Sequence, residues 1–355
     1  MKYTILFITL IIIVWYFFFR IKHKFWDRQP VSRNNLKKEG IISNVLPKPI
    51  KLRSPIEVIK IQSNDKTFQK FLPSFLNNHY ISEYTYDTKY IEWFFTFPNL
   101  KATTINHTGK IVGTIINKPY NVKMGDDTIY SHYVDMLSIH TEHRKKNYAS
   151  LLMSNTIQIT SNNLYKTYIF KTENKTLPYN HFCKSKYYIF NIEKSFDTNP
   201  QYSLSPSTNK DIEYIRDLYH RESKKYKCYP ILDTEQEEYI FTSKNGVYES
   251  LIIKVDDIPK GVVTYVVNFI ENKNLKRAEI VLLLCEDVNY INVVECLINH
   301  CKKYQINELI CIDMAQNNQF IYNMSFRPGM DVYFYMYNYH LNKQIESSDI
   351  LFNYV

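Results

Sequence analysis

The spacing of hydrophobic and polar positions along this 355-residue chain predicts a mixture of helices and strands. Apolar residues recur at helical spacing in residues 66–76, 89–95, 212–219 and 292–304. Short apolar runs between turn signals predict strands at 101–105, 110–117, 122–124, 134–139, 167–171, 250–255, 261–269, 278–285, 309–313 and 332–337. The order helix, hairpin, strand, helix, strand occurs twice, near 60–171 and 208–313. The pattern therefore predicts an α+β fold in which two copies of one unit share a mixed sheet.

The stretch 133–149 contains a predicted strand, a basic turn and the start of a predicted helix, and it is the best candidate for a functional site. The apolar strand 134–139 leads into a basic turn that contains Arg144, Lys145 and Lys146, and a helical pattern begins directly after the turn. A helix N-terminus offers free backbone N–H groups and the positive end of a dipole, to which the three cations add full charge. The stretch therefore indicates a phosphate site. The alternative is a solvated basic turn, which is the commoner outcome for three adjacent cations.

The N-terminus has a different character, because residues 3–19 form an uncharged run at the short end of what spans a bilayer as a helix. Lys2 precedes this run, whereas Arg20, Lys22 and Lys24 follow it. The heavier positive charge on the downstream side predicts that this side faces the cytosol. No small-x-small cleavage site follows the run, which favours an uncleaved anchor over a signal peptide. We therefore expect a single-pass membrane protein whose main part lies on the cytosolic side.

Composition narrows the range of partners. The formal charge of +9 favours anionic partners such as phosphates, nucleic acid or acidic lipid. The basic residues show no nucleic-acid-binding signature, and there is no glycine-rich nucleotide loop. The six cysteines contain no Cys-x-x-Cys pair, and His140 and His143 lack a ligand set at metal spacing. We expect reduced core cysteines, no metal and no nucleic-acid partner.

Six pieces of the sequence match, in order, the motifs of a known protein family. The most specific is Lys24-Phe-Trp-Asp-Arg-Gln-Pro-Val31, close to the family's Phe-Trp-x-Thr-Gln-Pro-Val. The stretch 133–149 resembles Glu-Ile-Asn-Phe-Leu-Cys-Val-His-Lys-Lys-Leu-Arg-Ser-Lys-Arg-Leu-Ala-Pro. The other pieces are 109–121, 172–178, 312–317 and 335–339. From about residue 23 onward the chain thus resembles the glycylpeptide N-tetradecanoyltransferases, or N-myristoyltransferases. The resemblance implies two pseudo-symmetric acyl-CoA N-acyltransferase (GNAT-like) units, which agrees with the repeat.

The resemblance also implies an acyl-CoA site and no cofactor, with myristoyl-CoA as the expected substrate. The basic loop lies where the family holds the phosphates of acyl-CoA, and it comprises Arg144, Lys145, Lys146, Asn147, Tyr148 and Ala149. Phe25 and Trp26 match residues that pack around the bound coenzyme A.

The chemistry implied by the resemblance is acyl transfer to the N-terminal glycine amine of a protein. The backbone N–H groups of Met136 and Leu137 occupy the family's oxyanion positions, where each donor is commonly worth about 3 kcal/mol. Thr172 matches a threonine that holds the substrate amine. The base is the C-terminal carboxylate, here that of Val355. Asp135 stands where the family has asparagine, and it would either hold an ammonium group more tightly or share the work of the base.

Together these expectations divide the chain into four parts: a membrane anchor (1–24), an extended arm (25–55), an acyl-CoA-binding half (56–201) and a peptide-binding half (202–355). The sequence leaves two other functions open. One is a membrane-tethered homologue that binds acyl-CoA or proteins without catalysis. The other is an N-acyltransferase with a different acyl donor or amine acceptor.

Overall fold

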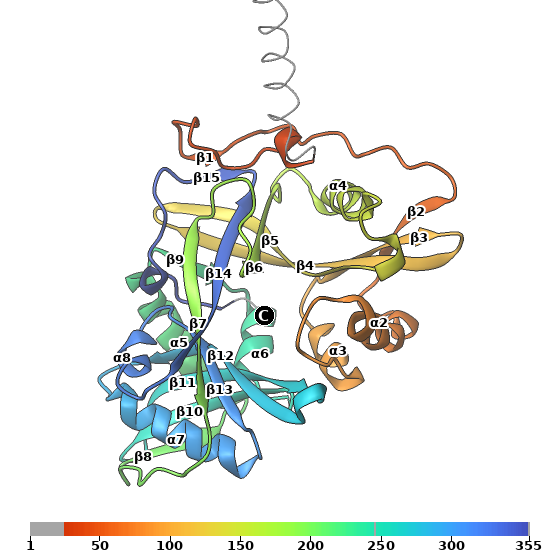
Figure 1. The fold of residues 1–355 in the computed structure, drawn as a ribbon. Helices are drawn as coiled ribbons and strands as arrows, with labels where there is room; N and C mark the ends of the chain where they lie inside the picture. The colour runs from red at the N-terminus through yellow and green to blue at the C-terminus, as the bar shows by residue number, and fades with distance from the viewer. Residues whose placement is uncertain (1–24, 245, 354–355) are drawn as a thin grey trace, which may run out of the picture.

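The computed structural model describes residues 25–244 and 246–353, which build one long twisted sheet with helices on its faces (Figure 1). The strands up to residue 191 are β1 (Gly40–Ile41), β2 (Ile56–Ile61), β3 (Lys101–His107), β4 (Lys110–Met124), β5 (Asp127–Ile139), β6 (Thr167–Glu173) and β7 (Cys183–Asn191). The later strands are β8 (Tyr202–Pro206), β9 (Cys228–Ile231), β10 (Tyr248–Val255), β11 (Ile258–Ile270), β12 (Leu275–Cys285), β13 (Glu308–Ile312), β14 (Arg327–Tyr337) and β15 (Tyr339–His340). The α-helices are α2 (Lys66–His79), α3 (Thr88–Phe94), α4 (Tyr148–Thr160), α5 (Ile212–Glu222), α6 (Thr234–Phe241), α7 (Tyr290–Lys303) and α8 (Asn318–Ile321).

Within the described residues, thirteen strands form the main sheet, and twelve of them follow the order β2-β3-β4-β5-β6-β14-β7-β13-β12-β11-β10-β8. β9 pairs with β4 off this path, and β1 and β15 form a separate two-stranded sheet. The order confirms a mixed α+β sheet. It also shows that the two halves interlock, because β14 from the end of the chain lies between β6 and β7.

The two halves repeat one pattern of strand pairing. In the first half β4 and β5 are antiparallel with a bulge near Ile115, and β5 then pairs in parallel with β6 only over 131–133. In the second half β11 and β12 are antiparallel with a bulge near Val281, and β12 pairs in parallel with β13 only over 277–279. The sequence repeat therefore corresponds to a structural repeat. In each copy, an irregular strand separates from its parallel neighbour after a short paired stretch.

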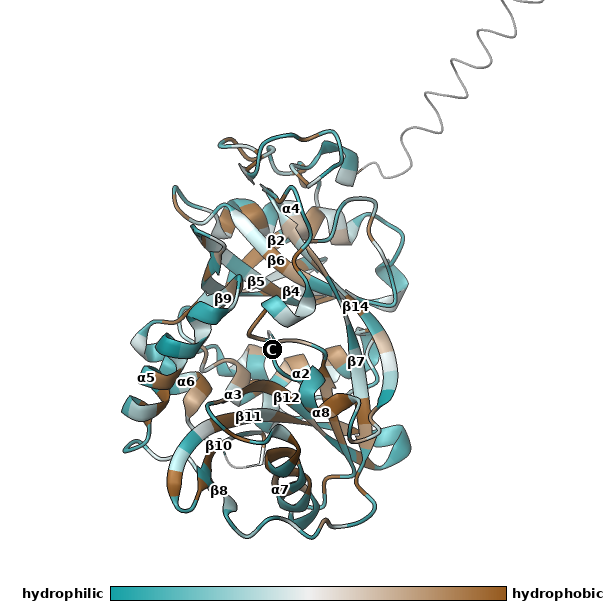
Figure 2. Cartoon of the chain, turned by 90° about the vertical axis from the view of Figure 1, so that its left-hand side faces the viewer, coloured by the Kyte–Doolittle hydropathy of each residue, from teal (hydrophilic) through white to brown (hydrophobic). Residues whose placement is uncertain are grey.

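Helix α7 illustrates why the pattern of apolar positions placed these elements correctly. Asn289 caps its first turn by accepting N–H bonds from Ile291 and Asn292. Its inward face is fully buried and consists of Val293, Val294, Leu297, Ile298 and Cys301. Hydrophobic and hydrophilic residues alternate along α7 in Figure 2.

Several elements are longer than the sequence pattern predicted. The expected strands 110–117 and 122–124 are one continuous strand, β4, and the expected strand 134–139 is the second half of β5. Both strands extend because they form one hairpin that closes at Gly125, whose positive φ of 57° suits a tight turn.

The membrane anchor expected at 3–19 lies outside the described residues. Over 25–244 and 246–353, no helix is both long enough and apolar enough to cross a bilayer.

Candidate active site

The predicted oxyanion residues lie at the bulge in β5. Met136 and Leu137 stand together opposite Ile115 of β4, because Thr114 pairs with Ser138 while Ile116 pairs with Asp135. Met136 has a φ of 49°, a left-handed conformation that is uncommon for a residue with a side chain. The hydroxyl of Thr114 donates to the Met136 carbonyl at 3.2 Å and helps to hold this conformation. The bulge breaks the regular hydrogen bonding of the strand at Met136 and Leu137, the two residues predicted to supply oxyanion donors.

The bulge lies where β5 and β6 separate. The last parallel pair is Tyr133 with Ile169, and beyond it β6 continues along β14. Alternation then gives the sheet two distinct faces here. One face, which we call the α4 face, carries Val134 and Phe170. The other, which we call the central face, carries Tyr133 and Asp135 and packs against the largest hydrophobic cluster. A molecule placed between the separated strands would contact both faces.

The Asp135 side chain occupies one of the two predicted oxyanion donors. Its carboxylate oxygen Oδ1 accepts the Met136 N–H at 2.7 Å. The side chain is half-buried. One of the two N–H groups expected to stabilise an oxyanion is therefore hydrogen-bonded to a carboxylate.

The basic loop after β5 has the backbone expected of an anion site. Lys145 and Asn147 both have a φ of 63°, and α4 begins directly after them at Tyr148. A left-handed residue before a helix start turns successive N–H groups toward one point, where an anion can bind. Lys145, Lys146 and Asn147 are exposed, and Ala149 lies in the first turn of α4. The loop thus places two exposed lysines at the start of α4, and phosphate binding there stays a prediction.

Arg144 differs from its two neighbours. Its Nε donates to the carbonyl of Ile139 at 3.2 Å, and its Nη2 donates to the carbonyl of His79. The guanidinium group therefore ties the loop to the ends of β5 and α2. Its charge contributes to the local potential, but its hydrogen-bonding capacity is partly used inside the protein.

A row of four imidazoles lies beside this loop. The ring centroids of His79 and His140 are 4.0 Å apart, those of His140 and His143 are 5.6 Å apart, and those of His143 and His107 are 5.2 Å apart. Burial lowers the pKa of His79, and His140 and Arg144 lower it further. Burial also lowers the pKa of His143, together with Lys146 and the neighbouring imidazoles. The sequence indicated only His140 and His143, because the other two come from α2 and β3.

The predicted aromatic pair Phe25 and Trp26 packs on the α4 face. The Trp26 ring stacks on Phe170 of β6 at 6.3 Å and contacts Tyr179 at 5.0 Å. Phe25 contacts Trp26 edge to face at 4.9 Å. Trp26 also belongs to the same cluster as Val134 and Ile157 of α4. The structure thus brings the arm and the helix that follows the basic loop to one face of the sheet.

Thr172 lies on the same face as Phe170, because residues two apart on a strand share a face. Its hydroxyl donates to the carbonyl of Lys175 at 2.5 Å. Lys171 points to the central face, where its Nζ donates to the hydroxyl of Tyr187 at 2.9 Å. The structure therefore places Thr172 and Asp135 on opposite faces and gives Thr172 an internal hydrogen-bond partner.

Glu279 is the centre of a buried polar network on the central face. Its Oε1 accepts bonds from Tyr187 at 3.0 Å and from Asn353 Nδ2 at 2.8 Å, and it lies 3.8 Å from Lys171 Nζ. Its Oε2 accepts a bond from Asn268 at 3.4 Å. Burial and the charge of Glu279 raise the pKa of Tyr187. This network joins both halves of the sheet to the end of the chain.

The C-terminal segment runs into the interior. Residues 350–353 are all buried, the Leu351 N–H donates to Cys228 O at 3.0 Å, and the Asn353 N–H donates to Val281 O at 3.2 Å. Val281 lies at the bulge of β12, the counterpart of the bulge in β5. The tail therefore reaches, in the second half, the position that corresponds to the predicted oxyanion bulge. The predicted base, Val355, lies outside the described residues.

Lys118 is a charged residue of this region that sequence reasoning missed. It is fully buried on β4 opposite Tyr133, and its Nζ lies 3.5 Å from the centroid of the Phe94 ring. Burial lowers the pKa of Lys118 to about 7, while the charge of Asp135 raises it. No clear signal in the sequence marks it, because β4 also contains other lysines and asparagines, namely Lys110, Asn117, Asn121 and Lys123.

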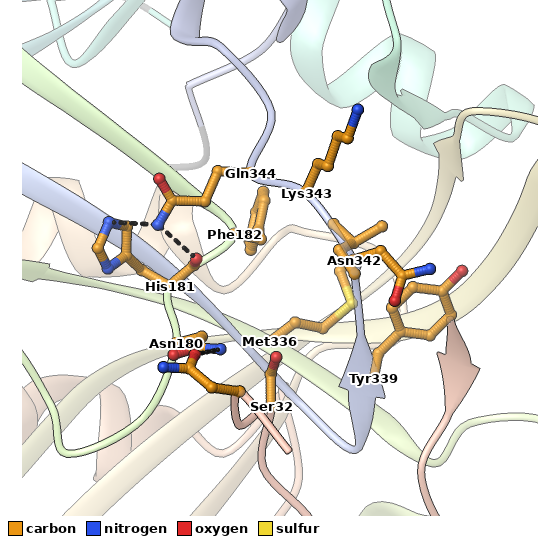
Figure 3. Close-up of a pocket in the computed structure, with 11 residues that line it drawn as sticks. Ser32, Asn180, His181, Phe182, Met336, Tyr339, Asn342, Lys343 and Gln344 are labelled. Carbon is orange, nitrogen blue, oxygen red and sulfur yellow. Dashed lines mark hydrogen bonds between the residues drawn. The ribbon is translucent and has the colours of Figure 1, made fainter. Parts of the chain in front are cut away.

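A separate cavity of about 210 Å³ lies between the arm and the end of β14 (Figure 3). His181 and Gln344 form one of its walls, with Gln344 Nε2 at 3.0 Å from His181 Nε2. None of the site residues predicted from the sequence lines this cavity.

Comparison with known proteins agrees with this geometry at two levels. The fold resembles a GCN5-related N-acetyltransferase from Anabaena variabilis, with a TM-score of 0.52, 14% identity, and coverage of 79% of this chain and 72% of that one. It resembles Saccharomyces cerevisiae N-myristoyltransferase with bound myristoyl-CoA more closely, with a TM-score of 0.81, 17% identity, and coverage of 94% of this chain and 100% of that one. The doubled unit, with its bulged and separating strands, is thus the tandem acyl-CoA N-acyltransferase fold.

Sequence comparison narrows this class. Residues 35–180 match the model of the N-terminal domain of myristoyl-CoA:protein N-myristoyltransferase. A glycylpeptide N-tetradecanoyltransferase of Dictyostelium discoideum is 22% identical over 370 residues, covering 89% of each chain. One of Drosophila melanogaster is 19% identical over 371 residues, covering 90% of this chain and 78% of the relative. The chain is thus similar to the N-myristoyltransferases over most of its length, and its residues 35–180 match the N-terminal domain of that family.

Proposed function

We propose that this protein transfers a myristoyl group from myristoyl-CoA to the N-terminal glycine amine of other proteins. The observation that carries the proposal is the arrangement around β5. A bulge with a left-handed residue, a pair of separating strands and a helix start preceded by exposed lysines lie together within 133–149. An acyl-CoA needs these three features, because it has a thioester carbonyl to polarise, a long chain to accommodate and phosphates to hold.

In the proposed complex, Lys145, Lys146 and the first N–H groups of α4 hold the phosphates of coenzyme A, and Tyr148 and Ala149 shape the start of the helix. Phe25 and Trp26 pack beside the coenzyme on the α4 face. The thioester carbonyl lies at the bulge, where the N–H groups of Met136 and Leu137 stabilise the negative charge that its oxygen gains during attack.

The proposed acceptor is an ammonium group that must lose a proton before it can attack. The Val355 carboxylate takes this proton, as the family resemblance implies. The neutral nitrogen then bonds to the acyl carbon and the C–S bond breaks. The second proton of the nitrogen goes to the departing thiolate. Support comes from residues 350–353, which are all buried and bond to the backbone of Cys228 and Val281. Thr172 would have to exchange its bond to Lys175 for one to the amine.

The test of the transfer reaction uses the full chain with myristoyl-CoA and a library of glycine-starting peptides. Mass spectrometry should show peptides that carry one myristoyl group, and matched peptides that start with alanine should stay unmodified. Absence of acylated peptide across the library would contradict the proposal. A variant with one residue added after Val355 should bind myristoyl-CoA normally but lose turnover. Unchanged turnover would remove the carboxylate base from the mechanism.

A second candidate function is acyl-CoA binding without catalysis. The bond from Met136 N–H to Asp135 favours it, because it occupies a donor that catalysis needs. Tight binding of myristoyl-CoA without transfer to any peptide would support this second function. Competition by acetyl-CoA at similar affinity would instead indicate a transferase with a shorter acyl donor.

We further propose that residues 3–19 anchor the protein in a membrane, with the catalytic part on the cytosolic side. The uncharged run and the basic residues after it support this proposal. Membrane fractions should retain the full chain after alkaline carbonate washing, and added protease should digest the catalytic part in right-side-out microsomes. Extraction of the full chain by carbonate would contradict the anchor.

A further inference from the structure

The contact between Asp135 and the Met136 N–H occupies one donor of the predicted oxyanion site before any substrate binds. The bond is 2.7 Å long and joins a charged acceptor to a backbone donor. Hydrogen bonds to charged groups are about twice as strong as neutral ones. A thioester carbonyl that arrives at the bulge must therefore displace this carboxylate to use the donor.

The bulge makes this contact more than a local feature of the strand. Met136 adopts a φ of 49°, and its side chain is buried, which keeps its backbone fixed in place. The Met136 carbonyl is held from the other side by Thr114. Because the peptide units around Met136 cannot turn freely, the donor becomes available only when the Asp135 side chain moves.

The Asp135 side chain faces other groups that can attract it away from the Met136 N–H. It is half-buried at the central face, in front of a set of phenols and beside Lys118 on the neighbouring strand. Burial is the largest cause of the raised pKa of Tyr80, Tyr86 and Tyr133, and the negative charge of Asp135 is the second largest. The carboxylate is thus the nearest strong negative charge for a group that enters between these phenols. A substrate ammonium group would be drawn to the same place.

Building on the proposed function, we propose that Asp135 is a gate controlled by the acceptor amine. Without acceptor, its carboxylate masks the Met136 N–H, and water is not activated against the bound thioester. When an ammonium group enters, the carboxylate shifts to the cation and frees the N–H for the thioester oxygen. Transfer then follows as described above, with one proton of the ammonium passing to the base and one to the coenzyme A thiolate. The gate would couple catalysis to the presence of an acceptor and limit wasteful hydrolysis of acyl-CoA.

A carboxylate suits this role better than the asparagine that the family resemblance places here. Asparagine has no net charge, so an incoming ammonium group would attract it only weakly away from the backbone donor. The aspartate is attracted to both partners, and the stronger charge of the ammonium decides between them.

The experiment measures release of coenzyme A thiol from myristoyl-CoA by the full-length protein, with and without a glycine-starting peptide. Asp135→Ala should raise release without peptide about ten-fold, because the freed donor can then assist attack by water. Asp135→Asn should lie between wild type and Asp135→Ala, because a neutral acceptor masks the donor less firmly. Glu173→Gln is the matched control. It removes a carboxylate on the same face and should leave release without peptide unchanged.

The outcomes separate this proposal from the proposed function. If release without peptide stays at the wild-type level in both Asp135 variants, the gate is wrong, whether or not wild type acylates peptides. If Glu173→Gln raises release as much as Asp135→Ala, the effect is general electrostatics and the gate is also wrong. If wild type acylates no peptide but Asp135→Ala hydrolyses myristoyl-CoA faster, Asp135 masks the Met136 N–H as proposed, but both the opening of the gate by an acceptor amine and the transferase function are wrong.

Discussion

Acidification should destabilise this protein through one buried histidine, His132. Its side chain lies on β5, only 1% exposed, and its Nε2 is 3.3 Å from the carbonyl of Thr160 at the end of α4. Its ring stacks on Tyr168 at a centroid distance of 5.4 Å. Burial, with a smaller contribution from the charge of Lys101, lowers the pKa of His132 from 6.5 to about 4. The residue therefore stays neutral in the folded protein over a pH range in which it is charged in the unfolded chain.

The sign of the effect follows from proton counting. As pH falls below 6.5, the unfolded chain gains a proton at His132, whereas the folded protein gains it only near pH 4. The free energy of unfolding must therefore decrease with falling pH across this window and stay constant, for this group, above it. At pH 5 the two pKa values correspond to a loss of about 2 kcal/mol.

Urea unfolding of the full chain at pH 7 and pH 5 measures this loss, and a His132→Phe variant isolates it. The phenyl ring keeps the stacking but cannot titrate, so the loss between the two pH values should shrink by about 2 kcal/mol. Tyr168→Phe is the control, because it removes a hydroxyl bonded to Thr160 at 2.9 Å without adding or removing charge in this range. It should lower stability equally at both pH values. If His132→Phe shows the same pH-dependent loss as wild type, the histidine is not the cause.

Three further predictions concern the proposed sites and the sheet. Changing Lys145 and Lys146 together to alanine should weaken myristoyl-CoA binding several-fold at low salt and less at high salt, because exposed charges are screened; calorimetry showing no change would reject the phosphate loop. Glu279→Gln should cost about 1–3 kcal/mol in urea unfolding, since it weakens four buried contacts, and wild-type stability would argue against the network. Gly261→Ala should lower stability by about 1–3 kcal/mol, because the new Cβ would lie 2.4 Å from Cys285 Cβ; a thermal midpoint equal to wild type would show that the strands can separate there.

The repeat in the fold could be predicted from the sequence because apolar spacing survives in both copies. Helix α7 keeps a complete apolar stripe, and the helix expected at 66–76 is present in α2, which continues to His79. Helix α6 was missed, because its sequence is polar and only Asp233 and Gln236 mark its start through a capping box. The capping box is visible in the sequence, but no apolar residues at helical spacing follow it to indicate a helix.

The candidate site was only partly predictable, because its details depend on contacts between distant segments. The bulge at Met136 and the helix start at Tyr148 follow from one continuous stretch. The orientation of Arg144 depends on the carbonyl of His79, which α2 brings from 65 residues away in the sequence. The position of Lys118 depends on Phe94, which belongs to another helix. A sequence pattern carries no information about such pairings.

The most direct test of the proposed function is mass spectrometry of a glycine-starting peptide after incubation with myristoyl-CoA and the full-length protein. The proposed function predicts a peptide that carries one myristoyl group on its N-terminal nitrogen, with release of one coenzyme A thiol for each peptide modified. Binding of myristoyl-CoA with no modified peptide, across a library of glycine-starting sequences, would contradict it.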